Sequence, residues 1–151
     1  MTTRRPALLI AAALTLTAAA GCSSSPAPIT AHGMLTVYDS PFSGLSMADA
    51  YPDITDGSQV TVTDPSGTVF GNGTLSYSKA DTLRFLLEAE AQYPQIGATL
   101  ASDIAIYTFT VTVPGGEPRY GIQAGRNRGT IWQSAAQMKA GPGLTLGSLT
   151  G

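Results

Sequence analysis

A strand–turn–strand pattern over residues 58–75 constrains the fold of this chain more than any other feature. Its first half alternates between polar and apolar side chains, which places Val60 and Val62 on one face of a strand. Residues 64–67 then read Asp-Pro-Ser-Gly, with Asp, Pro and Gly at the positions where a tight turn favours them. Residues 68–75 return as a second strand, so the sequence predicts a β-hairpin here.

Further segments rich in β-branched and aromatic residues predict other strands. They are residues 34–38, 104–113, 119–124 and 130–133. The segment at 104–113 carries the longest strand signal in the chain. The Pro- and Gly-rich stretch at 114–118 predicts a hairpin between it and the strand that follows.

One helix is predicted as an insertion at about residues 79–93. Ser78 and Asp81 have the spacing of an N-terminal capping box. Leu83, Leu87 and Ala91 recur at the helical period, flanked by Leu86, and predict the face that packs on the domain's own sheet. Docking of a partner on this face is the alternative.

The composition fits a turn-rich β domain, because only 12% of the residues are charged and the chain holds 17 Gly and 10 Pro. A single cysteine excludes an intrachain disulfide, so burial alone must hold the core together. We predict a mainly β chain with one helix, folded as a small antiparallel β-sandwich over residues 34–139. The Gly-rich tail at 140–151 is expected to be frayed, with a weak edge strand as the alternative.

Residues 1–21 have the three parts of a secretory signal peptide. Arg4 and Arg5 supply a positive start, an apolar run follows, and small residues ending in Gly21 precede the only cysteine, Cys22. The apolar run is too short for a transmembrane helix, which needs about 20 apolar residues. We therefore expect an exported protein.

The stretch before Cys22 resembles the lipobox of bacterial lipoprotein precursors, with Ala19 at the position where that family usually has Leu. The resemblance implies signal cleavage between Gly21 and Cys22 and attachment of a diacylglycerol to the cysteine thiol. A flexible tether is expected over residues 22–33, with the only histidine, His32, at its end. These features predict a lipid-anchored protein on the extracytoplasmic face of the cell membrane. Ordinary cleavage that leaves a free thiol is the alternative, and export by the Sec or the twin-arginine route stays open.

Charge and motifs narrow the function classes. Without residues 1–21 the chain has six basic and ten acidic residues, a formal net charge of −4. No long basic stripe is present, so nucleic acid is not an expected partner. The sequence has no phosphate-binding loop, nucleophile elbow, metal-ligand cluster or convincing triad, so we predict neither an enzyme nor a cofactor. A carboxylate pair for glycoside hydrolysis, from Asp53 or Asp56 with Glu88 or Glu117, is the enzymatic alternative.

Binding is expected to fall on aromatic and arginine side chains, because Trp, Tyr and Arg dominate binding hot spots. The candidate binding residues are Tyr120, Arg126, Arg128 and Trp132. For Trp132, burial in the core is favoured over recognition.

The long loop at 39–57 contains Asp49, Asp53 and Asp56. Hard cations such as calcium prefer several carboxylate and carbonyl oxygens, so this cluster is a weak metal candidate. Local hydrogen bonding by Asp at turns and caps is favoured instead.

Two longer stretches carry family resemblances. Residues 60–69 (Val-Thr-Val-Thr-Asp-Pro-Ser-Gly-Thr-Val) together with residues 109–122 are similar to transthyretin-like and carboxypeptidase-regulatory-like domains. Residues 58–138 resemble a group of uncharacterised actinobacterial lipoproteins, whose members often carry a cysteine pair that this chain lacks. The resemblance implies a transthyretin-like or immunoglobulin-like β-sandwich and supplies no catalytic residues.

Together these features predict a lipid-anchored envelope lipoprotein. Its non-catalytic β-sandwich is expected to bind a protein or an envelope component at the outer face of the cytoplasmic membrane. One alternative is a prophage-encoded lipoprotein that acts in superinfection exclusion. A second is a carrier of a small ligand or lipid, which requires a sizeable apolar cavity.

Overall fold

The structure is a computed structural model of the 151-residue chain and describes residues 25–39, 47–92, 104–126 and 128–147. The predicted signal peptide, Gly21 and Cys22 lie outside the described residues, so export and lipidation stay predictions. Among the described residues, no helix has the length and apolar character needed to cross a membrane.

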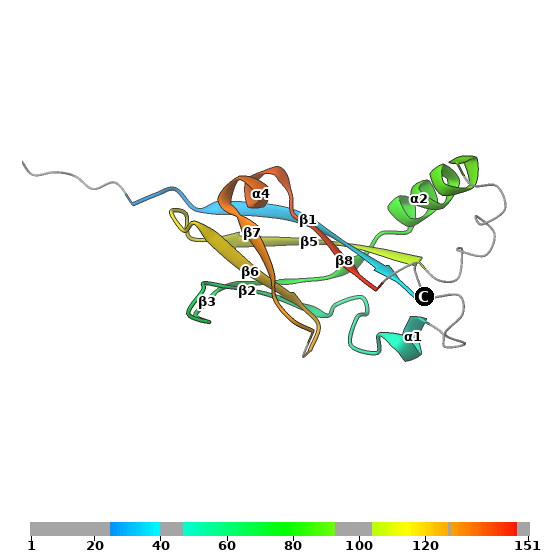
Figure 1. The fold of residues 1–151 in the computed structure, drawn as a ribbon, viewed down its shortest axis with the longest axis horizontal. Coiled ribbons are helices and arrows are strands. Elements are labelled where there is room, and N and C mark those ends of the chain that lie inside the picture. The colour runs from blue at the N-terminus through cyan, green and yellow to red at the C-terminus, as the bar shows by residue number, and fades with distance from the viewer. Residues whose placement is uncertain (1–24, 40–46, 93–103, 127, 148–151) are drawn as a thin grey trace, which may run out of the picture.

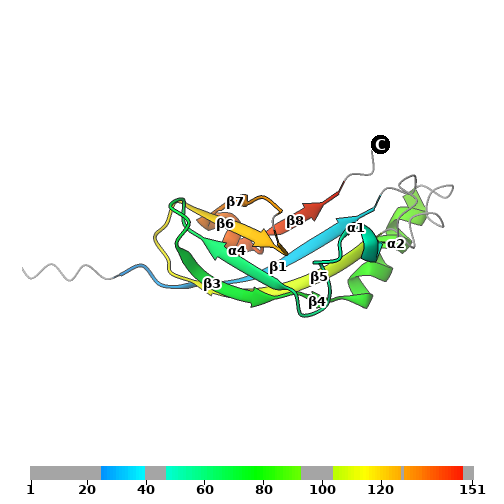
Figure 2. The same ribbon diagram turned by 90° about the horizontal axis from the view of Figure 1, so that it is seen from below.

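Two four-stranded sheets face one another (Figure 1, Figure 2). The first sheet has the order β4-β5-β1-β8 and the second has the order β3-β2-β6-β7. The strands are β1 (Ile29–Tyr38), β2 (Gln59–Thr63), β3 (Val69–Thr74), β4 (Ser76–Tyr77), β5 (Ile104–Val113), β6 (Arg119–Ala124), β7 (Ile131–Ser134) and β8 (Gly143–Leu146). All pairs are antiparallel except β1 with β8. The prediction of a mainly β chain is confirmed, and the two sheets are consistent with a small β-sandwich.

The core lies between the sheets because alternation turns one face of each strand inward. Val60 and Val62, predicted to share a face, are buried together with Leu35 and Val37 of the first sheet. Burial of each such side chain contributes about 1.5–3 kcal/mol. The predicted hairpin is β2 and β3, and its turn closes with a hydrogen bond of 3.1 Å from the Gly67 N–H to the Asp64 carbonyl.

Glycines in β3 close one side of the sandwich. A Cβ atom on Gly71 would lie 2.5 Å from the Thr112 carbonyl oxygen, and one on Gly73 would lie 2.6 Å from that of Thr110. Any side chain there would collide with the backbone of β5, so glycine lets the two sheets approach. The pairing of β2 with β3 shifts register just before these glycines.

The helix α4 (Ala135–Ala140) covers the opposite side, where it contacts β1, β6 and β7. Ser134 caps it: the Ser134 Oγ accepts the Gln137 N–H, and the Gln137 side chain accepts the Ser134 N–H. Met138 points into the core and is fully buried. The remaining described helices are α1 (Met47–Ala50), in the segment expected to lack regular structure, and α2 (Lys79–Gln92).

α2 packs on the outer face of the first sheet, as expected, but of the predicted face only the flanking Leu86 takes part (Figure 1). The contact is formed by Phe85, Leu86 and Ala89 against Ile104 and Ile106. Leu83 and Leu87 are instead 49% and 66% exposed, so the predicted packing face was wrong.

Hydrogen bonds at the start of α2 explain its rotation. The Ser78 Oγ accepts the Asp81 N–H at 3.3 Å, while the Ser78 N–H donates to the Ile106 carbonyl at 2.8 Å. The hydroxyl of Thr82 accepts the Ile106 N–H at 3.1 Å and is buried. The helix therefore turns the Thr82 face toward β5, although hydrophobic periodicity treats that residue as polar.

β1 begins at Ile29, inside the segment expected to be a tether over residues 22–33. The inward positions there hold Ala31 and Gly33, whose small size hid the strand alternation. His32 is therefore not in a tether. It pairs across the sheet with Thr110, and its Nδ1 lies 3.1 Å from the Thr110 hydroxyl.

Two expectations at the C-terminal end were also wrong. The tail expected to be frayed instead contains the edge strand β8, which is the alternative named for it; β8 runs parallel to β1 and buries Leu144 opposite Leu35. β5 and β6 do not form a hairpin, because residues 114–118 carry the chain from the first sheet to the second. A turn sequence indicates that the chain reverses direction and does not specify which sheet it enters.

Candidate functional site

Trp132 lies on the outer face of the second sheet, directly across from Gly121. Its side chain is 42% exposed, so the preference for burial in the core was wrong. A Cβ atom on Gly121 would lie 3.0 Å from the ring atom Cη2 of Trp132 and 2.6 Å from a methyl group of Thr130. The indole therefore rests over the glycine backbone, which no larger residue would permit.

The guanidinium of Arg119 lies close to the indole of Trp132. Arg119 precedes Gly121 by two residues on β6, so alternation places both on the same face of the sheet. The central carbon of its guanidinium lies 5.9 Å from the centroid of the Trp132 ring, within the range of a cation–π interaction.

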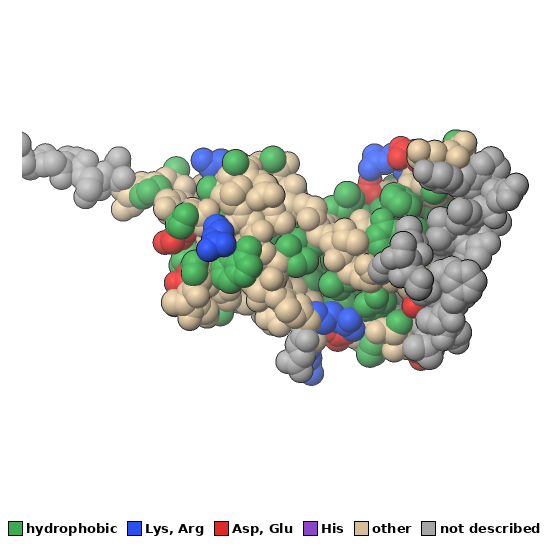
Figure 3. Space-filling view, viewed as in Figure 1, with side chains coloured by type: hydrophobic (Ala, Val, Ile, Leu, Met, Phe, Trp, Pro, Cys, Tyr) green, Lys and Arg blue, Asp and Glu red, His purple; other side chains and the backbone are tan. Residues whose placement is uncertain are grey.

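A row of residues crosses the four strands beside the indole. Val69, Thr63, Gly121 and Trp132 are successive partners from β3 to β7. A second row joins Asn72, Thr61 and Gln123. We call the outward-facing residues of these rows, together with Arg119, the Trp132 surface. Among the residues of β2, β3, β6 and β7, Arg119 is the only charged one. Figure 3 shows a blue side chain beside a green patch over β6 and β7.

Tyr120 is not part of this surface. It is fully buried, because alternation along β6 turns it inward with Ile122. Its hydroxyl donates to the Pro114 carbonyl at 2.8 Å, across the corner that joins the two sheets. The interpretation of Tyr120 as a recognition residue is therefore corrected to a structural role.

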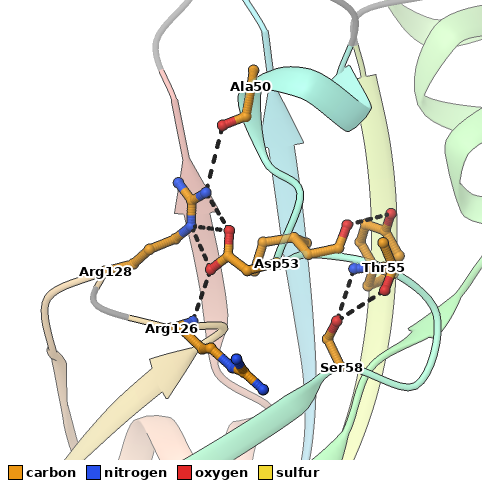
Figure 4. A network of polar contacts seen from close by, with 8 residues as sticks. Ala50, Asp53, Thr55, Ser58, Arg126 and Arg128 are labelled. Atoms are coloured by element: carbon orange, nitrogen blue, oxygen red, sulfur yellow. Dashed lines mark hydrogen bonds and ion pairs between the residues drawn. The ribbon is translucent and has the colours of Figure 1, made fainter.

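Arg128 is also engaged within the molecule (Figure 4). Its Nε donates to both carboxylate oxygens of Asp53 at 2.9 Å, and a terminal guanidinium nitrogen makes an ion pair with the same carboxylate. The guanidinium also lies over the ring of Tyr51, 4.6 Å from its centroid. The Arg126 N–H donates to Asp53 at 2.7 Å, so the ion pair joins residues 51–53 to the turn after β6.

These contacts shift two pKa values. The hydrogen bonds from Arg128 lower the pKa of Asp53 from 3.8 to about 2, although partial burial acts in the opposite direction. The same carboxylate raises the pKa of Arg128. Asp53 is therefore ionised across the physiological range, and Arg128 is not free to contact a ligand.

The weak calcium candidates do not converge in the described residues. Asp53 is held by Arg128, whereas Asp56 accepts the Tyr77 N–H at 2.7 Å. Asp49 lies in α1. The described residues contain no group of three or more His, Cys, Asp or Glu that could hold a metal ion.

An open pocket of about 510 Å³ lies beside the ion pair, lined in part by Pro52, Gly57, Ser58 and Arg126. The N–H groups of Gly57 and Ser58 already donate to backbone carbonyls. Arg126 is exposed and is the one cation among the described residues that line the pocket. These described residues thus offer a single guanidinium, which does not make a complete anion site.

Of the four predicted binding residues, Trp132 and Arg126 are exposed, and the structure does not place them in one site. Sequence reasoning missed Arg119, Thr61, Thr63 and Gln123, because the register that aligns them with Trp132 cannot be read from a single strand. Comparison with protein-family models, curated proteins and solved structures found no match.

Proposed function

We propose that this chain is a lipid-anchored, non-catalytic envelope protein that binds an extracytoplasmic partner through the Trp132 surface. The observation that carries the binding role is the exposed indole beside Arg119, on a sheet face that is otherwise uncharged. Trp and Arg are enriched among residues that dominate binding energy. The anchor rests on the sequence around Cys22.

We infer an immunoglobulin-like sandwich in preference to a transthyretin-like one. A tyrosine at the start of a strand, bonded through its hydroxyl to the backbone a few residues upstream, is typical of immunoglobulin-like domains. Tyr120 and the Pro114 carbonyl have this arrangement where the chain passes between the sheets.

The position of the N-terminal strand supports an anchor. Six residues lie between Cys22 and Ile29, so the two are at most about 25 Å apart when the chain is extended. The strand β1 enters at the end of the molecule opposite α1 and α2 (Figure 1). A lipid on Cys22 would therefore hold that end near the bilayer and leave the Trp132 surface on the flank of the domain.

A non-catalytic role is supported by how the carboxylates are used. A glycosidase needs one carboxyl group with a raised pKa as its acid and a second across a cleft. Asp53 has a lowered pKa and is ion-paired, and Asp56 accepts a backbone N–H. Glu117 lies in the turn that follows β5. The first residue of β1, Ile29, pairs with the last residue of β5, so this turn lies at the end of the sheet where β1 begins.

Photocrosslinking in intact cells tests the binding role. A benzophenone amino acid in place of Gln123 samples the Trp132 surface, and the same amino acid in place of Thr110 samples the outer face of the first sheet. We expect light-dependent adducts from position 123 only. Adducts from position 110 alone, or none from position 123, would exclude this surface as the contact.

A further inference from the structure

We propose that the Trp132 surface binds a polysaccharide with pyranose rings. This inference rests on the proposed function and names the class of ligand. It follows from three properties of the surface: a flat aromatic ring, unengaged hydroxyl and amide groups, and a nearly complete absence of charge.

The flat ring supplies the apolar contact. A pyranose ring presents C–H groups on one face, and an aromatic face that is supported from below provides area at little entropic cost. The indole of Trp132 rests over Gly121 and cannot sink into the sheet, because the backbone lies beneath it. It is thereby held ready for stacking.

The polar rows supply hydrogen bonds. Thr61, Thr63, Asn72 and Gln123 lie on the same outer face of the sheet as the indole, in the two rows described above. Within the part of the chain that the structure describes, none of their side chains makes a hydrogen bond. Hydroxyl and amide groups both donate and accept, as the hydroxyl groups of a sugar require. At about 4.8 Å between neighbouring strands, the row from Val69 to Trp132 spans about 14 Å, which suits a short stretch of a glycan chain.

The charge of the surface favours a glycan over a nucleic acid. A nucleic acid requires several cations along its phosphates, and the strands of the second sheet carry only Arg119. They carry no carboxylate, so acidic groups on a wall glycan would meet no repulsion from these strands.

The single tryptophan makes the interaction directly measurable, because all indole emission arises from Trp132. The mature protein in detergent is titrated with a hexamer of β-1,4-linked N-acetylglucosamine, with maltohexaose and with solubilised wall polysaccharide from the native host. We expect a saturable change in tryptophan emission with at least one of them. No change with any of the three would overturn the proposal.

Variants are compared by electrophoresis through gels that contain the bound glycan. Trp132→Ala is expected to lower affinity about tenfold, and Gln123→Ala about threefold. Leu87→Ala removes an exposed apolar side chain from α2, outside the Trp132 surface, and is expected to bind as the unaltered protein does. If circular dichroism shows that Trp132→Ala does not fold, the affinity of Gln123→Ala tests the inference instead. Retardation of the folded variants equal to that of the unaltered protein would contradict the inference.

Failure of this inference can be distinguished from failure of the proposed function. A crosslink from position 123 to a protein, without glycan binding, would contradict a polysaccharide as the ligand and leave the surface as a binding site. If neither a crosslink nor glycan binding were observed, the proposed binding function itself would be contradicted.

Discussion

At the scale of single residues, the Asp53 carboxylate was a candidate metal ligand and instead joins two loops. We call its contacts with Arg126 and Arg128 the Asp53 clamp. The carboxylate accepts the Arg126 N–H and the Arg128 guanidinium, and so ties two loops together. An Asp in a loop with other acids suggests metal binding only when no cation of the chain reaches it. The pairing with Arg128, 75 residues away, could not be seen in the local sequence.

Replacement of Asp53 by Asn should lower the free energy of unfolding by about 1–3 kcal/mol. The side chain of Arg128 is only 24% exposed and would lose its charged partner. Urea denaturation measures the change. Glu90→Gln, at an exposed position in α2, is the control and should change stability by less than about 0.5 kcal/mol. Equal losses in the two variants would contradict the clamp.

The pH dependence of stability provides a second view of this clamp. Because the pKa of Asp53 is lowered from 3.8 to about 2, the unfolded chain binds the proton more tightly than the folded protein. The stabilisation is therefore complete above about pH 5 and is lost as pH falls toward 2, by about 1–2 kcal/mol after screening. Asp53→Asn should flatten the stability curve in this window, and a curve of unchanged slope would contradict the assignment.

Gly121 should control the position of the indole. Gly121→Val introduces atoms where Trp132 and Thr130 already lie, so the ring must lift from the sheet and emit at longer wavelength. Fluorescence of the folded variant measures this displacement. Gly143→Ala, where an added Cβ would meet nothing within 4 Å, should leave the emission unchanged. An unshifted spectrum for Gly121→Val would show that the ring does not depend on the glycine.

At the scale of elements, α2 shows that hydrophobic periodicity alone does not determine which face of a helix packs on the sheet. Leu86→Ala should cost about 1–3 kcal/mol, because Leu86 packs against Ile104 and Ile106. Leu87→Ala should cost less than about 0.5 kcal/mol, because Leu87 is 66% exposed. Thermal or urea unfolding of the two variants compares them. The reverse order would restore the face predicted from the sequence.

Elements whose inward positions hold large apolar residues were predictable from the sequence. The strand β2 and the long strand β5 are of this kind. The strand β3 has Gly71 and Gly73 at inward positions and was predictable from the turn at 64–67 before it. The first half of β1 was missed because Ala31 and Gly33 fill its inward positions. β8 was only the alternative to a frayed tail, because a four-residue strand depends on its parallel pairing with β1, which is a tertiary contact. The Trp132 surface depends in the same way on the register between strands.

At the scale of the whole molecule, burial holds the sandwich together, and its two open sides are closed by different means. Glycines let β3 approach β5 on one side, and Met138 of α4 fills the other. The space between the sheets is occupied by core side chains, so nothing in the described residues favours the carrier alternative. The surface of the domain is where a partner would bind.

The most direct test of the lipid-anchored assignment is mass spectrometry of the mature protein isolated from its native membrane. We expect an N-terminal peptide that begins at Cys22, lacks residues 1–21 and carries a diacylglycerol on the cysteine sulfur. Cys22→Ala should abolish both the lipid and the recovery in the membrane fraction. A mature protein with an unmodified Cys22, or one that begins after it, would contradict the anchor.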